Sequence, residues 1–282
     1  MELEIPKYLS IKNYQKVNSL EHLSSTEKTV EVLAILGDIP SEQLKKKHSK
    51  DLPKMYDKVT EALFDVGYEY YPIIEVEGVL YGYQPITKMT LGEYIDLENL
   101  TKKPLENLDQ IMAILYRPVL KHRFKSLEFK IKNGLRLGQG KLEDVLKYYT
   151  VEEYDSNKRY DYAEIFQDIP VAYALGALSF FFANRKHTLE RYRDLFVQNQ
   201  NPEGEEGDAE SDGQTTFSEH WGWLVTIYHL ASTPILSVTG DKSITAVNFI
   251  GVLNYLAYEK DKTRQDEQRR KLLEQQRSYR IK

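Results

Sequence analysis

Apolar residues change their spacing along the first quarter of the chain. They recur three and four residues apart in 25–37 and 53–67, which predicts two helices, and a cap at Ser41 with Glu42 early after it predicts another over 41–52. Each of the three ends at glycine or before proline. Residues 3–17 instead alternate well enough to predict an edge strand or an extended arm. This part of the chain is therefore expected to be an extended arm followed by three helices.

A β-hairpin is predicted over residues 73–83. This stretch is rich in β-branched and aromatic residues, and Glu77-Gly78 interrupts it where a tight turn would fall. A helix is expected to begin at Thr90, because Thr90 and Glu93 have the spacing of a capping box. Residues 73–83 thus form the β component of an otherwise helical pattern.

The middle of the chain returns to helical spacing with interruptions. Residues 105–118 read as a helix that Pro118 ends or kinks. Residues 121–140, basic and glycine-containing, predict a loop or a second short β segment. Residues 141–166 look helical in pieces, with a polar, tyrosine-rich break at 152–164.

The most apolar stretch is residues 169–183. Its 15 residues are too few for a typical membrane span, so it predicts a buried core helix. Helical spacing then continues to about Asn199. The N-terminus has neither a basic nor an apolar signal region, so no signal peptide and no membrane association are expected.

Residues 201–214 form the clearest linker. They carry six acidic residues, three glycines and no aromatic residue, which predicts a flexible acidic loop. A helix capped by Thr216 follows and Pro234 breaks it, and a final helix is expected from near Ser243. After Tyr258 this helix becomes polar on every side.

The predicted fold is mainly α with a small β component near 73–83: a multi-helix globular body with a polar C-terminal helix. The expected segments are 1–70 (helical), 71–200 (hairpin and helical core), 201–214 (linker) and 215–282 (C-terminal helices). Whether the last segment packs on the core as one domain is left open. The predicted core comprises Leu33, Leu36, Leu63, Ile111, Leu115, Leu175, Leu178, Phe181, Leu224, Ile227, Ile250 and Leu253.

Composition narrows the function classes. The net charge is −5, which argues against a general nucleic-acid binder, and the absence of cysteine excludes disulfides, thiolate metal sites and cysteine nucleophiles. The 21 tyrosines fit either amphipathic core edges or an extended protein-contact surface. The same two interpretations apply to the aromatic group Trp221, Trp223 and Tyr228.

Chemical motifs are mostly missing. The glycine stretch 134–142 does not have P-loop spacing, the six histidines form no metal-ligand pattern, and no nucleophile elbow exists. We therefore expect no catalytic residue, no cofactor and no metal site. One binding feature remains, in the C-terminal helix, where residues 259–282 have a net charge of +4. The candidate partner-binding residues are Lys260, Lys262, Arg264, Arg269, Arg270 and Lys271. A solvated helix laced with ion pairs is the alternative.

The order of these segments resembles a loose group of tailed-bacteriophage morphogenesis proteins. It is most similar to tail-assembly or baseplate-hub assembly chaperones encoded near the tape-measure gene. The matching segments lie between Ser25 and Lys262: the hairpin IIEVEGVLYGY, then MTLGEYIDLENL, NLDQIMAILYRPV, KRYDYAEIF, IPVAYALGALSFFF and VLNYLAYEKDKTR. The N-terminal helical segment and the polar C-terminal helix depart from the shorter members.

The resemblance implies a non-enzymatic protein of the host cytoplasm that binds tail or tape-measure components until they assemble. Its partners would be other viral structural proteins. The alternative is a structural virion protein of the portal, tail or baseplate, which would form a symmetric oligomer. Two other classes stay open: an enzyme without a recognisable motif, and a cellular scaffold or regulator.

Overall fold

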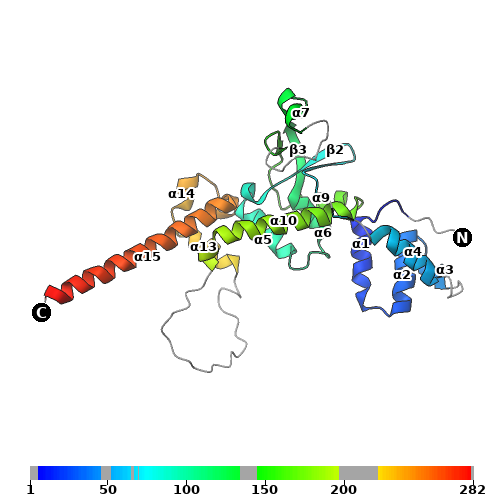
Figure 1. The fold of residues 1–282 in the computed structure, drawn as a ribbon, viewed down its shortest axis with the longest axis horizontal. Helices are drawn as coiled ribbons and strands as arrows, with labels where there is room; N and C mark the ends of the chain where they lie inside the picture. Colours follow the sequence, from blue (N-terminus) through cyan, green and yellow to red (C-terminus); the bar gives the residue numbers. More distant parts are fainter. Residues whose placement is uncertain are drawn as a thin grey trace, which may run out of the picture. The chain divides into compact units, whose positions relative to one another are not determined.

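The computed structural model describes residues 6–45, 52–64, 67–68, 70–133, 145–196 and 222–280. It is mainly helical with one small antiparallel sheet (Figure 1), which confirms the predicted fold class. The chain divides into two compact units that are interleaved in sequence. The first unit comprises Met1–Pro85 and Asp96–Ala183, and the second comprises Ile86–Ile95 and Asn184–Lys282.

The first unit begins with short helices: α1 (Ile11–Asn18), η1 (Ser19–His22), α2 (Ser25–Gly37), α3 (Ser41–Lys45) and α4 (Leu52–Phe64). The strand or arm predicted for 3–17 is wrong from residue 11 onward, where α1 begins. The Ser10 hydroxyl accepts a hydrogen bond from the Asn13 N–H and starts α1. In the part of this segment that the structure describes, from residue 6, the β-like feature is an isolated bridge between Ser10 and Pro170. The N-cap hydrogen bond at Ser10 favours a helix more strongly than the weak alternation of apolar residues favours a strand.

Helix α2 begins with a capping box one residue earlier than the pattern suggested. The Ser24 N–H donates to the Glu27 carboxylate at 3.3 Å. The helix closes at Asp38, whose φ of 48° lies in the left-handed region. Between these ends, Val30, Leu33 and Leu36 are buried at helical spacing. The apolar face predicted for this helix is therefore its buried face.

The sheet has four antiparallel strands in the order β1 (Ile73–Val76), β2 (Val79–Tyr83), β3 (Tyr116–His122) and β4 (Tyr149–Val151). The predicted hairpin is confirmed as β1 and β2. Its turn has positive φ at both central residues, 50° at Glu77 and 78° at Gly78. This is the backbone of a type I′ turn, whose twist matches that of paired strands.

The helix predicted over 105–118 ends early. Helix α6 (Leu108–Leu115) is followed directly by β3, which contains Pro118. A proline disfavours helical backbone at the residue before it, which here is Arg117, so α6 must end before Arg117. Pro118 lacks an N–H, but its carbonyl accepts one from Glu152 at 2.9 Å. The same proline therefore ends the helix and is tolerated in the strand.

Two further predictions for the middle of the chain need correction. Helix α7 (Leu127–Asn133) lies where a loop or short β segment was expected, although β3 does reach His122. Helix α9 (Arg159–Phe166) begins inside the predicted break at 152–164. The glycine stretch 134–142 and the acidic linker 201–214 lie outside the described residues.

The apolar stretch forms the long helix α10 (Val171–Arg191), and α11 (Arg193–Phe196) continues it. Ala174, Ala177, Leu178 and Phe181 are buried, which confirms the predicted core helix.

Tyrosines form a large part of the core of the first unit. Tyr83 and Tyr116 are 1% exposed, and Tyr83 contacts Tyr116 edge-on. The Tyr116 hydroxyl donates to the Tyr71 carbonyl at 2.5 Å, and the Tyr149 hydroxyl donates to the Tyr83 carbonyl at 2.8 Å. Burial raises the pKa of Tyr83, Tyr116 and Tyr149, which keeps these hydroxyls neutral. The rings act as apolar packing, and the hydroxyls of Tyr116 and Tyr149 are satisfied by backbone carbonyls.

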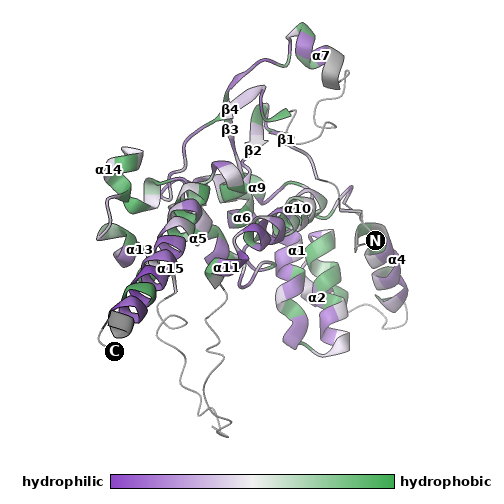
Figure 2. Cartoon of the chain, turned by 60° about the vertical axis from the view of Figure 1, so that its left-hand side comes forward, coloured by the Kyte–Doolittle hydropathy of each residue, from purple (hydrophilic) through white to green (hydrophobic). Residues whose placement is uncertain are grey.

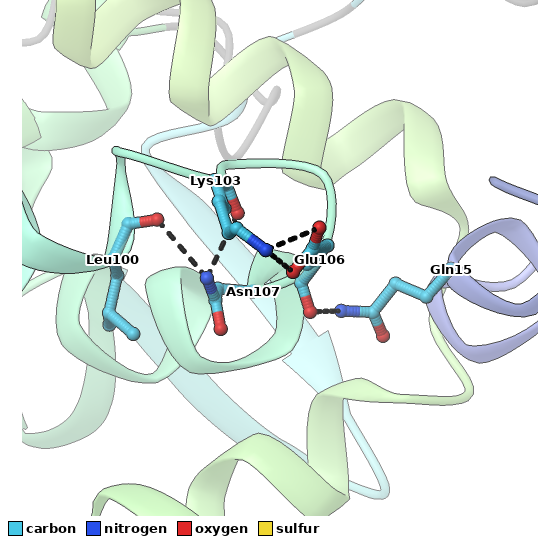
Figure 3. Close-up of polar contacts among 5 residues, drawn as sticks. All are labelled: Gln15, Leu100, Lys103, Glu106 and Asn107. Atoms are coloured by element: carbon cyan, nitrogen blue, oxygen red, sulfur yellow. Dashed lines mark hydrogen bonds and ion pairs between the residues drawn. The ribbon is translucent and has the colours of Figure 1, made fainter. Parts of the chain in front are cut away.

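The turn between α5 (Leu91–Leu100) and α6 is held by side chains (Figure 3). The Asn107 amide donates to the carbonyls of Leu100 and Lys103, at 3.3 and 2.9 Å. The Lys103 ammonium pairs with the Glu106 carboxylate at 3.0 Å, and the Gln15 amide donates to the Glu106 carbonyl at 2.8 Å. The turn is therefore tied both to the end of α5 and to α1.

The second unit contains η2 (Ile86–Lys88), the start of α5, α13 (Trp223–Ala231), α14 (Ile235–Thr239), η3 (Ile244–Ala246) and α15 (Phe249–Arg280). The predicted capping box is confirmed: the Thr90 N–H donates to the Glu93 carboxylate at 2.7 Å, and the Glu93 N–H donates to the Thr90 hydroxyl at 3.2 Å. The final helix starts at Phe249, later than Ser243, because η3 intervenes.

An aromatic stack forms the centre of the second unit. The ring of Phe249 stacks on Tyr94 with 3.8 Å between centroids, and Trp223 meets both rings edge-on at 5.6 and 6.0 Å. Trp223 is half-buried and packs against these core rings, whereas Tyr228 is 70% exposed. Trp221 lies outside the described residues.

Eight of the twelve predicted core residues are buried: Leu33, Leu36, Leu63, Ile111, Leu115, Leu178, Phe181 and Leu253. Three are half-buried: Leu175, Ile227 and Ile250. Leu224 is 38% exposed, so its prediction is wrong. Helix α13 is apolar on every side, and its spacing therefore could not show that Leu230 is the residue facing inward.

Candidate partner-binding helix

The first third of α15 is packed into the second unit. Val252 and Leu253 are buried. The Tyr192 hydroxyl donates to the Asn254 side chain at 2.7 Å. The His229 ring nitrogen lies 2.7 Å from the Glu259 carboxylate, which joins α13 to α15. These contacts anchor the helix up to about residue 260.

Beyond that point the helix has a different environment. Every residue from Asp261 to Arg277 is exposed, and Figure 2 shows this part of α15 as mostly hydrophilic. An isolated polar helix gains little from packing and is only marginally stable in water. A helix that continues this far without a packed face is therefore suited to contact a partner.

The structure separates the six candidate residues. Lys260 is half-buried and its ammonium donates to the backbone carbonyl of Asp194 in α11, so it has a structural role. The other five are exposed on the distal part of the helix: Lys262, Arg264, Arg269, Arg270 and Lys271. The predicted cations are thus accessible with one exception.

Two of these cations form part of a continuous row, which we call the basic row. It comprises Tyr258, Lys262, Gln265, Arg269, Leu272 and Gln276. Alternating steps of four and three residues place them along one side of a helix, the spacing with which helices pack against each other. The row contains no acidic residue, and both Tyr258 (62% exposed) and Leu272 (59% exposed) are accessible apolar side chains.

The remaining cations have acidic neighbours on the helix surface. Arg270 and Lys271 each follow an acidic residue, Asp266 and Glu267, by four positions. This is the favourable spacing and order for ion pairs within a helix. Lys262 and Arg269 also follow an acidic residue, Glu259 and Asp266, by three positions. The alternative interpretation, a helix stabilised by its own charge pairs, therefore applies to the basic row as well.

A polar cluster in the first unit was not predicted. The Tyr154 hydroxyl donates to the Asp96 carboxylate at 2.6 Å, and Arg159 pairs with the same carboxylate at 3.4 Å. Glu152 is bound in the same way, by the Lys158 ammonium and the Tyr162 hydroxyl.

Each carboxylate of the cluster is thus occupied by one tyrosine and one cation. Burial raises the pKa of Tyr154 and of Tyr162, so both remain hydrogen-bond donors. The cluster connects the chain after β4 to α5 and α9, and we assign it a structural role.

Acid should weaken this cluster. Hydrogen bonds from Lys158 and Tyr162 lower the pKa of Glu152 below its ordinary value of 4.5. The resulting stability is complete above that value and is lost as the pH falls through the lower folded-state pKa. Glu152→Gln should therefore lower the free energy of unfolding at neutral pH, by at most about 1 kcal/mol because solvent screens the pair. Urea unfolding of the unchanged protein and of Glu152→Gln, from neutral pH down through the folded-state pKa of Glu152, measures this loss. If the difference in free energy of unfolding between the two proteins stayed the same at low pH, the role assigned to Glu152 would be contradicted.

Among the described residues, no group of three or more histidine or acidic residues could hold a metal ion. No helix of that part of the chain is long and apolar enough to cross a membrane.

Comparisons with known proteins found no matching family model, no matching curated protein and no matching solved structure. The function is therefore argued from the residues of this chain.

Proposed function

We propose that this protein acts by binding other proteins, not as an enzyme, and that the distal part of α15 is the contact element. The observation that supports this is the exposure of every residue from Asp261 to Arg277, with the basic row along one side. An amphipathic partner could bury Tyr258 and Leu272 while its acidic residues approach Lys262 and Arg269. Such a contact combines apolar area with charge complementarity.

For the partner, we propose a tail or tape-measure component of a tailed bacteriophage. The order of segments, from the hairpin at 73–83 to the polar C-terminal helix, supports this through its resemblance to tail-assembly chaperones. In this role the protein would work in the host cytoplasm and hold a tail component before assembly. Chaperones of this kind bind transiently, which suits an accessible surface helix better than a large obligate interface.

The experiment is affinity capture of the tagged full-length protein from phage-producing cells, with mass spectrometry of the eluate and of purified particles. The proposal expects a tail or tape-measure protein in the eluate and no stoichiometric copy of this chain in particles. A fixed copy number in particles would instead indicate the structural virion protein. An eluate without viral protein would contradict the phage assignment.

A matched pair of variants tests the contact surface. The double variant Lys262→Gln/Arg269→Gln removes one lysine and one arginine from the basic row. Arg264→Gln/Lys271→Gln removes the same residue types from the other sides of the helix. We expect the first to weaken capture of the partner about tenfold, because two exposed charge pairs contribute roughly 1.4 kcal/mol together.

The second variant should bind like the unchanged protein, and circular dichroism should show equal helix content for both. Equal losses in the two variants would contradict a one-sided contact and favour non-specific attraction to the whole cationic helix.

A further inference from the structure

A second cationic surface lies in the first unit, on residues 120–130 and 145–150, which we call the basic lobe. These residues end β3, form the first turn of α7 and lead into β4 (Figure 1). Five exposed side chains are cationic: Lys121, Arg123, Lys125, Lys130 and Lys147. The lobe carries one acidic residue, Glu128, whose carboxylate accepts a hydrogen bond from the Tyr148 hydroxyl at 3.1 Å.

Among the described residues, the five cations of the basic lobe have no carboxylate partner. Some cations elsewhere do have a carboxylate partner, as in Lys103 with Glu106 and Lys158 with Glu152. In a protein of net charge −5, five unpaired cations on one small lobe are a local reversal of charge.

The basic lobe has a hydrophobic core beneath its surface. This core contains the aromatic residues Phe124, Phe129, Tyr148 and Tyr149. The Arg123 guanidinium donates to the Lys147 carbonyl at 3.2 Å and lies 6.0 Å from the centre of the Tyr148 ring. A backbone carbonyl and a ring face position this cation without cancelling its charge. Its charge therefore remains available to a ligand.

Two exposed aliphatic side chains accompany the cations. Leu120 in β3 is 63% exposed and Leu127 at the start of α7 is 74% exposed. Leu120 precedes Lys121 in the sequence, and Leu127 lies between Lys125 and Lys130. A ligand that matches this surface needs negative charge together with apolar groups.

We propose that the basic lobe is a docking surface for an acidic protein segment that also carries aliphatic side chains. The charges of the segment would meet Lys121, Lys125 and the other lobe cations, and its aliphatic groups would cover Leu120 and Leu127. A nucleic-acid backbone would satisfy the cations only, because phosphodiesters offer nothing to bury the leucines. The residues differ from those of the basic row, so the two surfaces can be tested separately.

The test uses the full-length protein and three fluorescent probes in anisotropy titrations. The probes are a short synthetic peptide of glutamate and leucine, a peptide of equal charge in which serine replaces leucine, and single-stranded oligothymidylate. The structure predicts tightest binding of the glutamate–leucine peptide. Lys121→Gln/Lys125→Gln should weaken that binding roughly tenfold at low salt, and less as salt screens the charges.

Leu120→Ser/Leu127→Ser should weaken binding of the glutamate–leucine peptide about fivefold and leave the serine peptide unchanged, because only the former buries these side chains. The matched control is Lys54→Gln/Lys58→Gln, which removes two exposed lysines of α4 and should bind like the unchanged protein.

Three results would overturn the proposal. The first is equal weakening in the α4 control, which would indicate general charge attraction. The second is an oligothymidylate affinity that exceeds both peptides and depends on the lobe lysines, which would indicate a nucleic-acid surface. The third is indifference of every probe to the lobe variants.

Discussion

Leu115→Asp should prevent the protein from folding. Leu115 is 0% exposed at the end of α6, and its carbonyl accepts the Gln84 N–H at 2.7 Å. The substitution removes a buried aliphatic side chain and places an unpaired carboxylate in its position. The lost packing alone is worth about 2–5 kcal/mol, and burying the charge adds to it. The sum is comparable with the total stability of an ordinary domain, roughly 5–15 kcal/mol.

Circular dichroism and size-exclusion chromatography of the purified variant measure this effect. Leu127→Asp is the matched control, because the same change at a residue that is 74% exposed should leave the fold intact. A Leu115→Asp protein that unfolds cooperatively near the temperature of the unchanged protein would show that α6 does not lie in the core.

Gly82→Ala should cause the second-largest loss of stability. A β-carbon at Gly82 in β2 would lie 2.3 Å from the Cε2 atom of the Tyr149 ring. That ring cannot easily move, because it is buried and its hydroxyl donates to the carbonyls of Pro72 and Tyr83, at 3.2 and 2.8 Å. Either the ring or the strand must shift. We expect a loss of about 2–4 kcal/mol, in the range of overpacked cores with a broken buried hydrogen bond.

Thermal or urea unfolding measures this loss. Gly67→Ala is the matched control in the same unit, since no atom lies within 4 Å of the added carbon. If Gly82→Ala proved as stable as the control, the close packing of Tyr149 over β2 would be wrong. If Tyr149 packs over Gly82, the double variant Gly82→Ala/Tyr149→Ala should lose less free energy of unfolding than the two single variants lose together. If it does not, the two losses should simply add.

Local signals predicted the elements whose structure depends on near neighbours. The hairpin at 73–83 followed from its β-branched pattern and from Glu77-Gly78, where the turn has positive φ. The capping box at Thr90 and Glu93 fixed the start of α5 for the same reason. In both cases residues within three positions of each other make the decisive contacts.

Elements that depend on distant contacts were predicted poorly. Residues 116–118 read as the end of a helix, but β2 offers Tyr116 a strand partner in Tyr83, 33 positions away. The polar cluster could not be predicted for the same reason, since the Tyr154 hydroxyl bonds to the Asp96 carboxylate, 58 positions away in the sequence. Spacing within one segment carries no information about such pairs.

The candidate binding residues were predicted by composition, and geometry refined them. An excess of cations after residue 259 indicated the region, but charge counting could not show that Lys260 bonds to Asp194 or that Lys262 and Arg269 share one side. Residues 121–140 also read as basic in the sequence, but neither that pattern nor the net charge of −5 could show that Arg123 lies beside Lys147 on the basic lobe. Charge must therefore be read per surface.

The most direct test of partner binding by α15 is capture with the full-length chain and with a chain that ends at Asp261. The account predicts that the shortened protein keeps its circular dichroism and unfolding transition, apart from the lost helix, and no longer retains the tail partner. Equal recovery of that partner by both proteins would contradict the assignment of α15 as the contact element.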